Sequence, residues 1–407
     1  MRKNLFAVVA VLAMLVCLVG CAASGQAAGS ASSAASAESS GGSFSAQPSE
    51  VQGQANADSG STAASDAAAI SDASVAFASW NADAASLSAL VSYVEAATDE
   101  GGSGYVPPKD RIAVFDMDGT FICEKAPIYM DHMLLLHRVQ EDPGYAPTDE
   151  MRALCDQMRA SADQGIPLND ADLPYKKNDA LADAFAGMTF DEFHAYVADF
   201  MATKGVEGFS GMTYGESFYK PMLEVIAYLQ RNDFDVYVVT ACEREVVRAV
   251  VEPLGIDASH VIGSDWAYAA TNQGDEDGAA YTFERSDDLL IAGYYLGETG
   301  KTNKVIAIQR EIGKHPVLAF GNSSGDFAML NYALDNEAYP AASFLVVADD
   351  TEREYGDDVK AADMYKEAEN AGWTAISMRY DWLAIYGDGV VKTHLRADNA
   401  QEQIEAA

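Results

Sequence analysis

Short apolar runs recur along the sequence, and each run ends in polar residues. Apolar runs that are not interrupted by polar residues are typical of strands buried on both faces of a parallel sheet. Between the runs lie stretches with helical spacing, such as the apolar residues Val305, Ile308 and Ile312. Alternation of such strands and helices predicts a doubly wound α/β fold with a parallel sheet between helices. The predicted strands are Ile112 to Phe115, Asp235 to Thr240, Val317 to Phe320 and Phe344 to Val347.

The segment between the first two strands, about residues 125–215, has a helical pattern instead. Thr148 and Thr189 each precede an apolar set at helical spacing, and Thr189 with Glu192 matches a capping box. We therefore predict an α-helical cap inserted into the α/β domain. Its aromatic residues, such as Phe193 and Phe200, are interpreted as the packed core of the cap rather than as a ligand cage.

The N-terminus has the pattern of a secretion signal. Arg2 and Lys3 precede an apolar run from Leu5 to Val19, and Leu18-Val19-Gly20-Cys21 resembles a bacterial lipobox. This pattern predicts a signal peptide over residues 1–20, a lipid such as palmitate on Cys21, and a location outside the cytoplasm at a bacterial cell membrane. The alternative is an uncleaved membrane helix, for which the apolar run is short.

Residues 21–75 consist almost entirely of Ala, Ser, Gly, Gln and Asp. Such a composition buries too little apolar surface to offset chain entropy, which predicts a flexible tether. The remaining residues, 76–407, are predicted to form the globular domain.

The charge balance excludes several classes of partner. The 407 residues include 26 Lys+Arg and 62 Asp+Glu, which gives a formal net charge of −36. Nucleic acid is therefore not an expected partner, and only the lipid would hold the chain at a membrane. An anionic substrate would need a metal or local cations to offset the repulsion. The five Cys and six His show no zinc-ligand spacing.

Polar residues that could take part in catalysis or metal binding follow the predicted strands. Asp116 and Asp118 follow the first strand, Thr240 ends the second, and Asn322 and Asp326 follow the third. Because the carboxyl ends of parallel strands meet at one edge, we expect these side chains to lie close together.

Two common motifs can be rejected at these positions. A calcium loop beginning at Asp116 would need glycine where Phe121 stands and glutamate where Pro127 stands. A phosphate-binding P-loop ending in Gly300-Lys301 would need glycine at Tyr295.

Taken together and in this order, the motifs resemble those of haloacid dehalogenase (HAD) superfamily phosphohydrolases, in the phosphoserine-phosphatase-like branch with a helical cap. The resemblance covers Trp80 to Tyr386. The segments Arg111 to Thr120, Phe320 to Asp326 and Met378 to Trp382 are similar to a bacterial envelope subgroup of these phosphatases.

The resemblance implies a phosphomonoester hydrolase that forms an aspartyl-phosphate. Asp116 would attack phosphorus, and Asp118 would protonate the leaving group and then activate water. Lys301 would neutralise the nucleophile and the phosphate. The predicted substrate contacts are Thr240, Ala241 and Lys125.

The same resemblance implies Mg²⁺ bound by Asp116, Asp118, Asn322 and Asp326. Many relatives have Asp where this chain has Asn322, which predicts weaker metal binding. Phosphoserine-specific relatives carry an acidic residue at about the position of Lys125, which argues against that substrate. Two alternatives remain open at this point: a non-catalytic phosphate- or metal-binding lipoprotein on the same scaffold, and a phosphotransferase of the superfamily. The acidic run from Asp349 to Asp358 is interpreted as a solvated loop.

Overall fold

The computed structural model describes residues 77–124, 127–164 and 176–394. The predicted signal peptide, the tether, Cys21 and Lys125 lie outside the described residues and stay predictions. Within the described ranges, no helix combines the length and the apolar character needed to cross a lipid bilayer.

A seven-stranded sheet forms the centre of the domain, in the order β5-β4-β3-β1-β6-β7-β8. All neighbouring strands run parallel except β5, which is antiparallel to β4. This arrangement confirms the predicted doubly wound α/β fold. The strands are β1 (Ile112–Phe115), β3 (Asp235–Glu243), β4 (Val261–Ala270), β5 (Leu289–Gly297), β6 (Leu318–Gly321), β7 (Ala342–Val347) and β8 (Thr374–Ser377).

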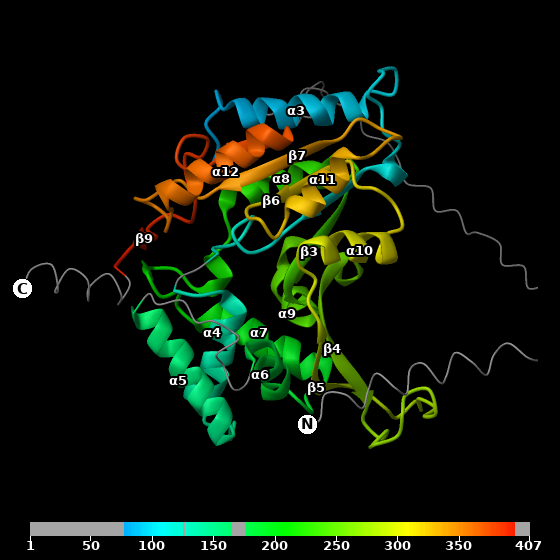
Figure 1. The fold of residues 1–407 in the computed structure, drawn as a ribbon, viewed down its shortest axis with the longest axis vertical. Helices are drawn as coiled ribbons and strands as arrows, with labels where there is room; N and C mark the ends of the chain where they lie inside the picture. Colours follow the sequence, from blue (N-terminus) through cyan, green and yellow to red (C-terminus); the bar gives the residue numbers. More distant parts are fainter. Residues whose placement is uncertain (1–76, 125–126, 165–175, 395–407) are drawn as a thin grey trace, which may run out of the picture. The chain divides into compact units, whose positions relative to one another are not determined.

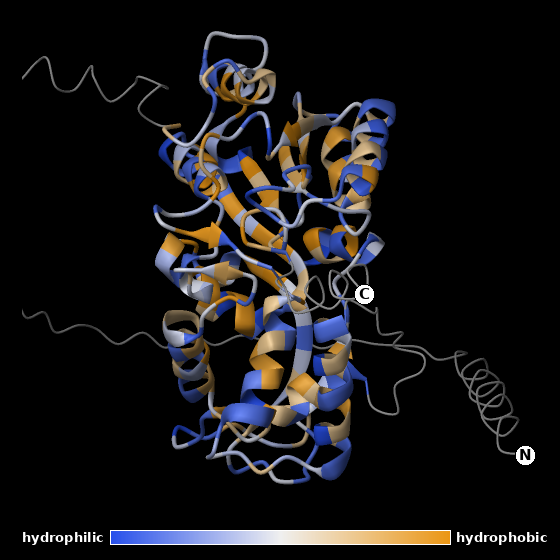
Figure 2. Ribbon diagram, turned by 90° about the vertical axis from the view of Figure 1, so that its left-hand side faces the viewer, coloured by the Kyte–Doolittle hydropathy of each residue, from blue (hydrophilic) through white to orange (hydrophobic). Residues whose placement is uncertain are grey.

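Helices cover both faces of the sheet (Figure 1). Within β1, Ala113 and Phe115 belong to one apolar cluster and Ile112 and Val114 to the other. This alternation follows from the opposite directions of successive side chains in a strand. Figure 2 shows the apolar residues concentrated in the strands of the sheet. The first cluster includes α3 (Ala85–Thr98), α8 (Lys220–Arg231) and α9 (Arg244–Val251), and the second includes α10 (Thr302–Glu311), α11 (Phe327–Leu334) and α12 (Asp358–Ala371).

The insertion between β1 and β3 is helical, as its sequence pattern predicts. Thr189 caps α7 through its side chain, and Glu192 completes the capping box. Phe193 and Phe200 are buried in the cap, which confirms their interpretation as core residues. The helices are α4 (Met130–Leu136), α5 (Asp149–Gln164), α6 (Lys177–Ala184) and α7 (Phe190–Thr203). After α7, the short strand β2 (Phe209–Ser210) pairs with β9 (Val391–Lys392) from the other end of the domain to form a two-stranded sheet.

The long hairpin of β4 and β5 ties the sheet to the cap and was not predicted. The N–H of Ile291 donates to the carbonyl of Met188 at 3.0 Å, and the N–H of Gly187 donates to the carbonyl of Ile291 at 2.8 Å. In Figure 1 the two strands run from the sheet to the side of α6 and α7. The cap is therefore joined to the core by backbone hydrogen bonds as well as by the chain.

The acidic run after β7 is solvated only in part: Glu352, Asp357 and Asp358 are exposed, as the sequence predicts, but the other three acidic side chains are buried. Asp349, Asp350 and Glu354 are each no more than 4% exposed. Asp349 accepts hydrogen bonds from Tyr365 and Ser377, both at 2.6 Å. Asp349 is satisfied by donors from distant parts of the chain, whereas Asp350 accepts from the nearby N–H groups of Glu352 and Arg353.

Candidate functional site

Asp116 lies directly after β1, at the carboxyl end of the central strand. Its backbone N–H donates to the carbonyl of Phe320 at 2.9 Å, which continues the pairing of β1 with β6. The carboxylate is 7% exposed, and its Oδ2 accepts a bond of 3.2 Å from Thr120. Burial raises the pKa of Asp116 to about 6, and the Asp326 carboxylate adds to the rise while Lys304 opposes it.

Lys304, not Lys301, is the lysine beside this carboxylate. Nζ of Lys304 lies 2.5 Å from Oδ1 of Asp116 and 2.7 Å from Oδ1 of Asp326. The Lys304 side chain is buried, because it lies on the face of α10 that packs against the sheet. Burial lowers the pKa of Lys304, but the two carboxylates outweigh burial and raise it.

The prediction for Lys301 is therefore wrong in its geometry. Lys301 precedes the first residue of α10 and has a φ of +53°, and its side chain is exposed. It lines the same cavity as Asp116, but the buried position between the carboxylates belongs to Lys304.

Asp118 provides a buried carboxylate oxygen without a partner. Its Oδ1 is buried and has no hydrogen-bond partner among the described residues. Burial raises the pKa of Asp118 well above its usual range, and the carboxylates of Asp131 and Asp116 add to the shift. A carboxyl group in this environment favours its protonated form and can therefore donate a proton.

Asn322 and Asp326 belong to the turn that follows β6, and the turn lies against Gly119. A Cβ atom on Gly119 would lie 2.0 Å from Nδ2 of Asn322, and Gly119 has a φ of +77°. Oδ2 of Asp326 accepts from the N–H groups of Asn322 and Ser323, both at 3.0 Å. Asp326 thus holds both the turn and Lys304.

Thr240 lies at the same edge of the sheet, within β3. Its Oγ1 accepts from the N–H of Cys242 at 3.1 Å, which leaves its own O–H available as a donor. Thr240 and Ala241 line the cavity with Asp116 and Asp118. The structure therefore brings together the side chains of Asp116, Asp118, Thr240, Lys304, Asn322 and Asp326.

The cavity has a volume of about 320 Å³ and lies between this edge and the cap. From the cap, α4 and the residue before it contribute Tyr129, Asp131 and His132, and α6 contributes Lys177 and Asn178. The cavity is therefore lined by residues from the carboxyl edge of the sheet on one side and by cap residues on the other, as ligand-binding cavities between two parts of a fold often are.

Other candidate residues have different places. Arg244 follows β3 near the cavity, but its guanidinium is held by Asp265 at 2.8 Å and by Glu311 at 2.7 Å. Cys123 and Cys242 are buried free cysteines, so they do not pair with each other.

The residues at this edge fit a small, hard cation. The carboxylate of Asp116 and the side-chain amide of Asn322 both line the cavity and offer oxygen donors of the kind that Mg²⁺ prefers. No group of three or more His, Cys, Asp or Glu side chains in the described ranges is placed to hold a metal. A cation here would therefore depend on an amide, backbone oxygen and water as well as on carboxylate.

Comparison with solved structures finds matches at low identity, each with a TM-score below 0.5. A protein from Bordetella pertussis Tohama I is 17% identical, with a TM-score of 0.41 over 65% of this chain and 97% of that one. A phosphoserine phosphohydrolase-like protein from Francisella tularensis is 12% identical, with a TM-score of 0.31 over 58% and 88%. Cytosolic 5′-nucleotidase IIIB bound to cytidine is 13% identical, with a TM-score of 0.40 over 85% and 100%.

Among curated proteins, no sequence matches this chain. The family model of haloacid dehalogenase-like hydrolases matches residues 113–331, which is more than half of the chain. The match begins in β1 and ends in α11, so it includes both Asp116 and Asp326. The chain therefore belongs to the haloacid dehalogenase-like hydrolase family.

Proposed function

We propose that this hydrolase is a Mg²⁺-dependent phosphomonoesterase of the phosphoserine-phosphatase-like branch. The observation that carries the proposal is the contact of Asp116 with Lys304 at 2.5 Å beside the unpartnered Oδ1 of Asp118. A nucleophile, a fixed positive charge and a proton donor then face one cavity.

Asp116 is the proposed nucleophile. Its carboxylate attacks phosphorus, the bond from phosphorus to the leaving oxygen breaks, and an aspartyl-phosphate forms on Asp116. Lys304 holds one carboxylate oxygen, so that the other is presented from a fixed position. The ammonium group also offsets negative charge that accumulates as the phosphate approaches.

Asp118 is the proposed general acid and base. Its buried carboxyl group is suited to give a proton to the departing alkoxide. The resulting carboxylate then takes a proton from the water that hydrolyses the aspartyl-phosphate. The site returns to its starting state with the release of inorganic phosphate.

Asp116, Asn322 and the backbone carbonyl of Asp118 are the groups proposed to hold Mg²⁺. When bound, Mg²⁺ would neutralise phosphate charge and orient the phosphoryl group. Asp326 supports this site through Lys304 and the turn that carries Asn322. The positive charges of Lys304 and of a bound Mg²⁺ would offset the repulsion between an anionic substrate and a chain with a net charge of −36.

The leaving group would lie on the cap side of the cavity, among residues such as Asp131, Lys177 and Asn178. A cavity of about 320 Å³ suits a small phosphomonoester. Closure by the cap would exclude water during the first step.

We also propose that the enzyme acts outside the cytoplasm, held to a bacterial membrane by a lipid on Cys21. The support is the sequence alone: the cationic start, the apolar run and the lipobox-like Leu18 to Cys21. Labelling with radioactive palmitate in a bacterial host would test this part, with Cys21→Ala as the unlabelled control.

The function is tested by phosphate release from an aryl phosphate in the presence of Mg²⁺. We expect activity in the wild-type chain and a loss of at least about 10³-fold in Asp116→Asn, because an amide is a poor nucleophile. Asp287→Asn is a matched control, since Asp287 is also 7% exposed but lies near the β4–β5 connection.

Each other outcome points to a different function. Equal activity in the wild type and Asp116→Asn would remove Asp116 as the nucleophile. Phosphate binding without turnover, even at high Mg²⁺, would favour a non-catalytic binding protein. Faster capture by an added alcohol than by water would favour a phosphotransferase.

A further inference from the structure

A buried hydroxyl group on β4 connects the end of β3 to the loop before α10, two segments that line the cavity. Oγ of Ser264 donates to the carbonyl of Ala241 at 2.7 Å and accepts from the N–H of Thr299 at 3.0 Å. Ser264 is 1% exposed and Thr299 is 5% exposed. Since a hydroxyl has one hydrogen to donate, both contacts occur at once only if Ser264 accepts from one side and donates to the other.

The Ala241 side of this contact leads directly to Thr240. The carbonyl of Ala241 and the N–H of Cys242 belong to one planar peptide group. That N–H donates to Oγ1 of Thr240 at 3.1 Å. Ser264 therefore restrains the Ala241–Cys242 peptide group, and the N–H of this peptide group orients the Thr240 hydroxyl in the cavity.

The Thr299 side leads to the helix that carries Lys304. Thr299 precedes Gly300 and Lys301, which line the cavity, and α10 begins at Thr302. Oγ1 of Thr299 also donates to the carbonyl of Gly263 at 2.8 Å. Two hydrogen bonds to neighbouring residues of β4 thus fix the entry to α10.

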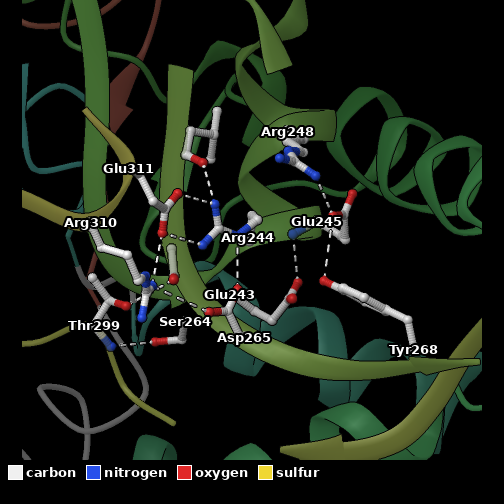
Figure 3. Close-up of polar contacts among 12 residues, drawn as sticks. Glu243, Arg244, Glu245, Arg248, Ser264, Asp265, Tyr268, Thr299, Arg310 and Glu311 are labelled. Carbon is white, nitrogen blue, oxygen red and sulfur yellow. Dashed lines mark hydrogen bonds and ion pairs between the residues drawn. The ribbon is translucent and has the colours of Figure 1, made fainter. Parts of the chain in front are cut away.

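The other end of α10 is held to the next residue of the same strand. Glu311, the last residue of α10, accepts from Arg244, which also donates to Asp265 at 2.8 Å. Figure 3 shows Ser264 against Thr299, and Arg244 contacting both Asp265 and Glu311. Lys304 lies between these two attachments.

Gly263 allows β4 to come close enough for these contacts. A Cβ atom on Gly263 would lie 2.7 Å from Cα of Arg244 and 2.9 Å from the carbonyl oxygen of Cys242. Both distances are shorter than any tolerated contact, so a larger residue would push β4 away from the segment after Thr240.

We propose that Ser264 and Thr299 are positioning residues of the phosphate site, and that they set the spacing between Thr240 and Lys304. This inference rests on the proposed function, because it assumes that both side chains face a phosphoryl group. Neither Ser264 nor Thr299 touches the reacting atoms in this assignment. They act through the Ala241–Cys242 peptide and through the start of α10.

The test compares Ser264→Ala with Ser343→Ala. Ser343 is a matched control because it is 2% exposed and donates to a backbone carbonyl, that of Leu330, at 2.7 Å. We expect kcat/KM for an aryl phosphate with Mg²⁺ to fall roughly 10- to 100-fold in Ser264→Ala, because small displacements of catalytic groups cost about that much. Ser343→Ala should stay within about twofold of the wild type.

A second readout is the Kd of inorganic phosphate in the presence of Mg²⁺, measured by calorimetry. We expect Ser264→Ala to weaken it about tenfold, since the Thr240 hydroxyl loses its fixed orientation. Thr299→Val should also weaken phosphate binding, because it removes the hydroxyl that donates to Gly263. Thr299→Ser keeps this hydroxyl and should bind phosphate as the wild type does. These two variants decide the question if Ser264→Ala does not fold.

The outcomes separate this inference from the proposed function. Turnover and phosphate binding within twofold of the wild type in both Ser264→Ala and Thr299→Val would overturn the positioning role. Phosphate binding without turnover in the wild type would overturn the proposed function. The Kd values of inorganic phosphate for the wild type and the variants would still test whether Ser264 positions the phosphate site. A wild-type chain that neither binds phosphate nor releases it would overturn both.

Discussion

Nζ of Lys304 lies 2.5 Å from Oδ1 of Asp116, and this contact joins α10 to the end of the central strand. The same ammonium group lies 2.7 Å from Oδ1 of Asp326. One lysine thus balances two buried carboxylates that would otherwise repel each other. The contact makes Lys304 part of both the chemistry and the stability of the site.

Replacing Lys304 should therefore have a much larger effect than replacing Lys301. We expect Lys304→Met to lower kcat for an aryl phosphate by about 10²–10³-fold, because it removes the fixed positive charge at the nucleophile. Lys301→Met should change kcat by less than about threefold, since Lys301 is exposed at the cavity rim. Steady-state kinetics on both variants, with urea unfolding to confirm that they are folded, would measure this. The opposite order of effects would return the catalytic role to Lys301.

Gly119 should be intolerant of any side chain for a reason specific to the site. Gly119 and Gly372 both have a φ of +77°, so alanine at either position should cost about 1–2 kcal/mol of stability. Only at Gly119 would the new Cβ displace Asn322, because nothing lies within 4 Å of a Cβ on Gly372. We expect Gly119→Ala to raise the Mg²⁺ concentration needed for half-maximal activity, and Gly372→Ala to leave it unchanged. A similar Mg²⁺ requirement in both variants would show that Asn322 is not held by this contact.

The sequence predicts four of the seven strands of the main sheet, the cap and the edge at which Asp116, Thr240 and Asn322 meet. These features follow from local apolar patterns and from the geometry shared by parallel sheets. The choice between Lys301 and Lys304 required more than the Gly300-Lys301 motif. Lys304 has the same helical spacing as the buried residues Ala307 and Ile308, and this spacing is the signal that identifies its buried face.

Other features had no local signal at all. Asp349 is buried because Tyr365, Ser377 and the backbone N–H of Arg379 donate to it. These partners lie 16–30 residues away in the sequence. From the local sequence alone, a run of acidic residues predicts exposure to solvent, because local composition carries no information about distant hydrogen-bond donors. The hydrogen bonds of Ser264 depend on tertiary geometry in the same way.

Asn322→Asp should strengthen metal binding. A carboxylate adds a negative charge and a harder ligand where the chain now offers a neutral amide. We expect the Mg²⁺ concentration for half-maximal activity to fall about tenfold, which corresponds to about 1.4 kcal/mol of metal binding. Activity titrations with Mg²⁺ after treatment with EDTA would measure the change. Asn336→Asp, outside the cavity lining, is the control and should leave the titration unchanged. An unchanged requirement in Asn322→Asp would remove Asn322 from the metal site.

Glu354 should make the protein less stable as the pH rises from about 4.5 to 7. Burial raises the pKa of Glu354 to about 7 from an ordinary value of 4.5, although hydrogen bonds from Tyr386 and from the N–H of Tyr355 oppose the rise. The folded state therefore holds this proton more tightly than the unfolded state does. The resulting stabilisation is fully present below about pH 4.5 and is lost as the pH rises through about 7.

Glu354→Gln removes this titration while its amide keeps a donor and an acceptor for the same two partners. Other groups also titrate over this range, so the informative quantity is the difference between the two proteins. We expect the free energy of unfolding of the wild type to fall relative to that of Glu354→Gln between pH 4.5 and 7, as measured by urea unfolding. Glu367→Gln on the exposed face of α12 should keep a constant difference from the wild type. A constant difference for Glu354→Gln as well would mean that Glu354 is ionised throughout this range, and that its contacts with Tyr386 and Tyr355 outweigh the cost of burial.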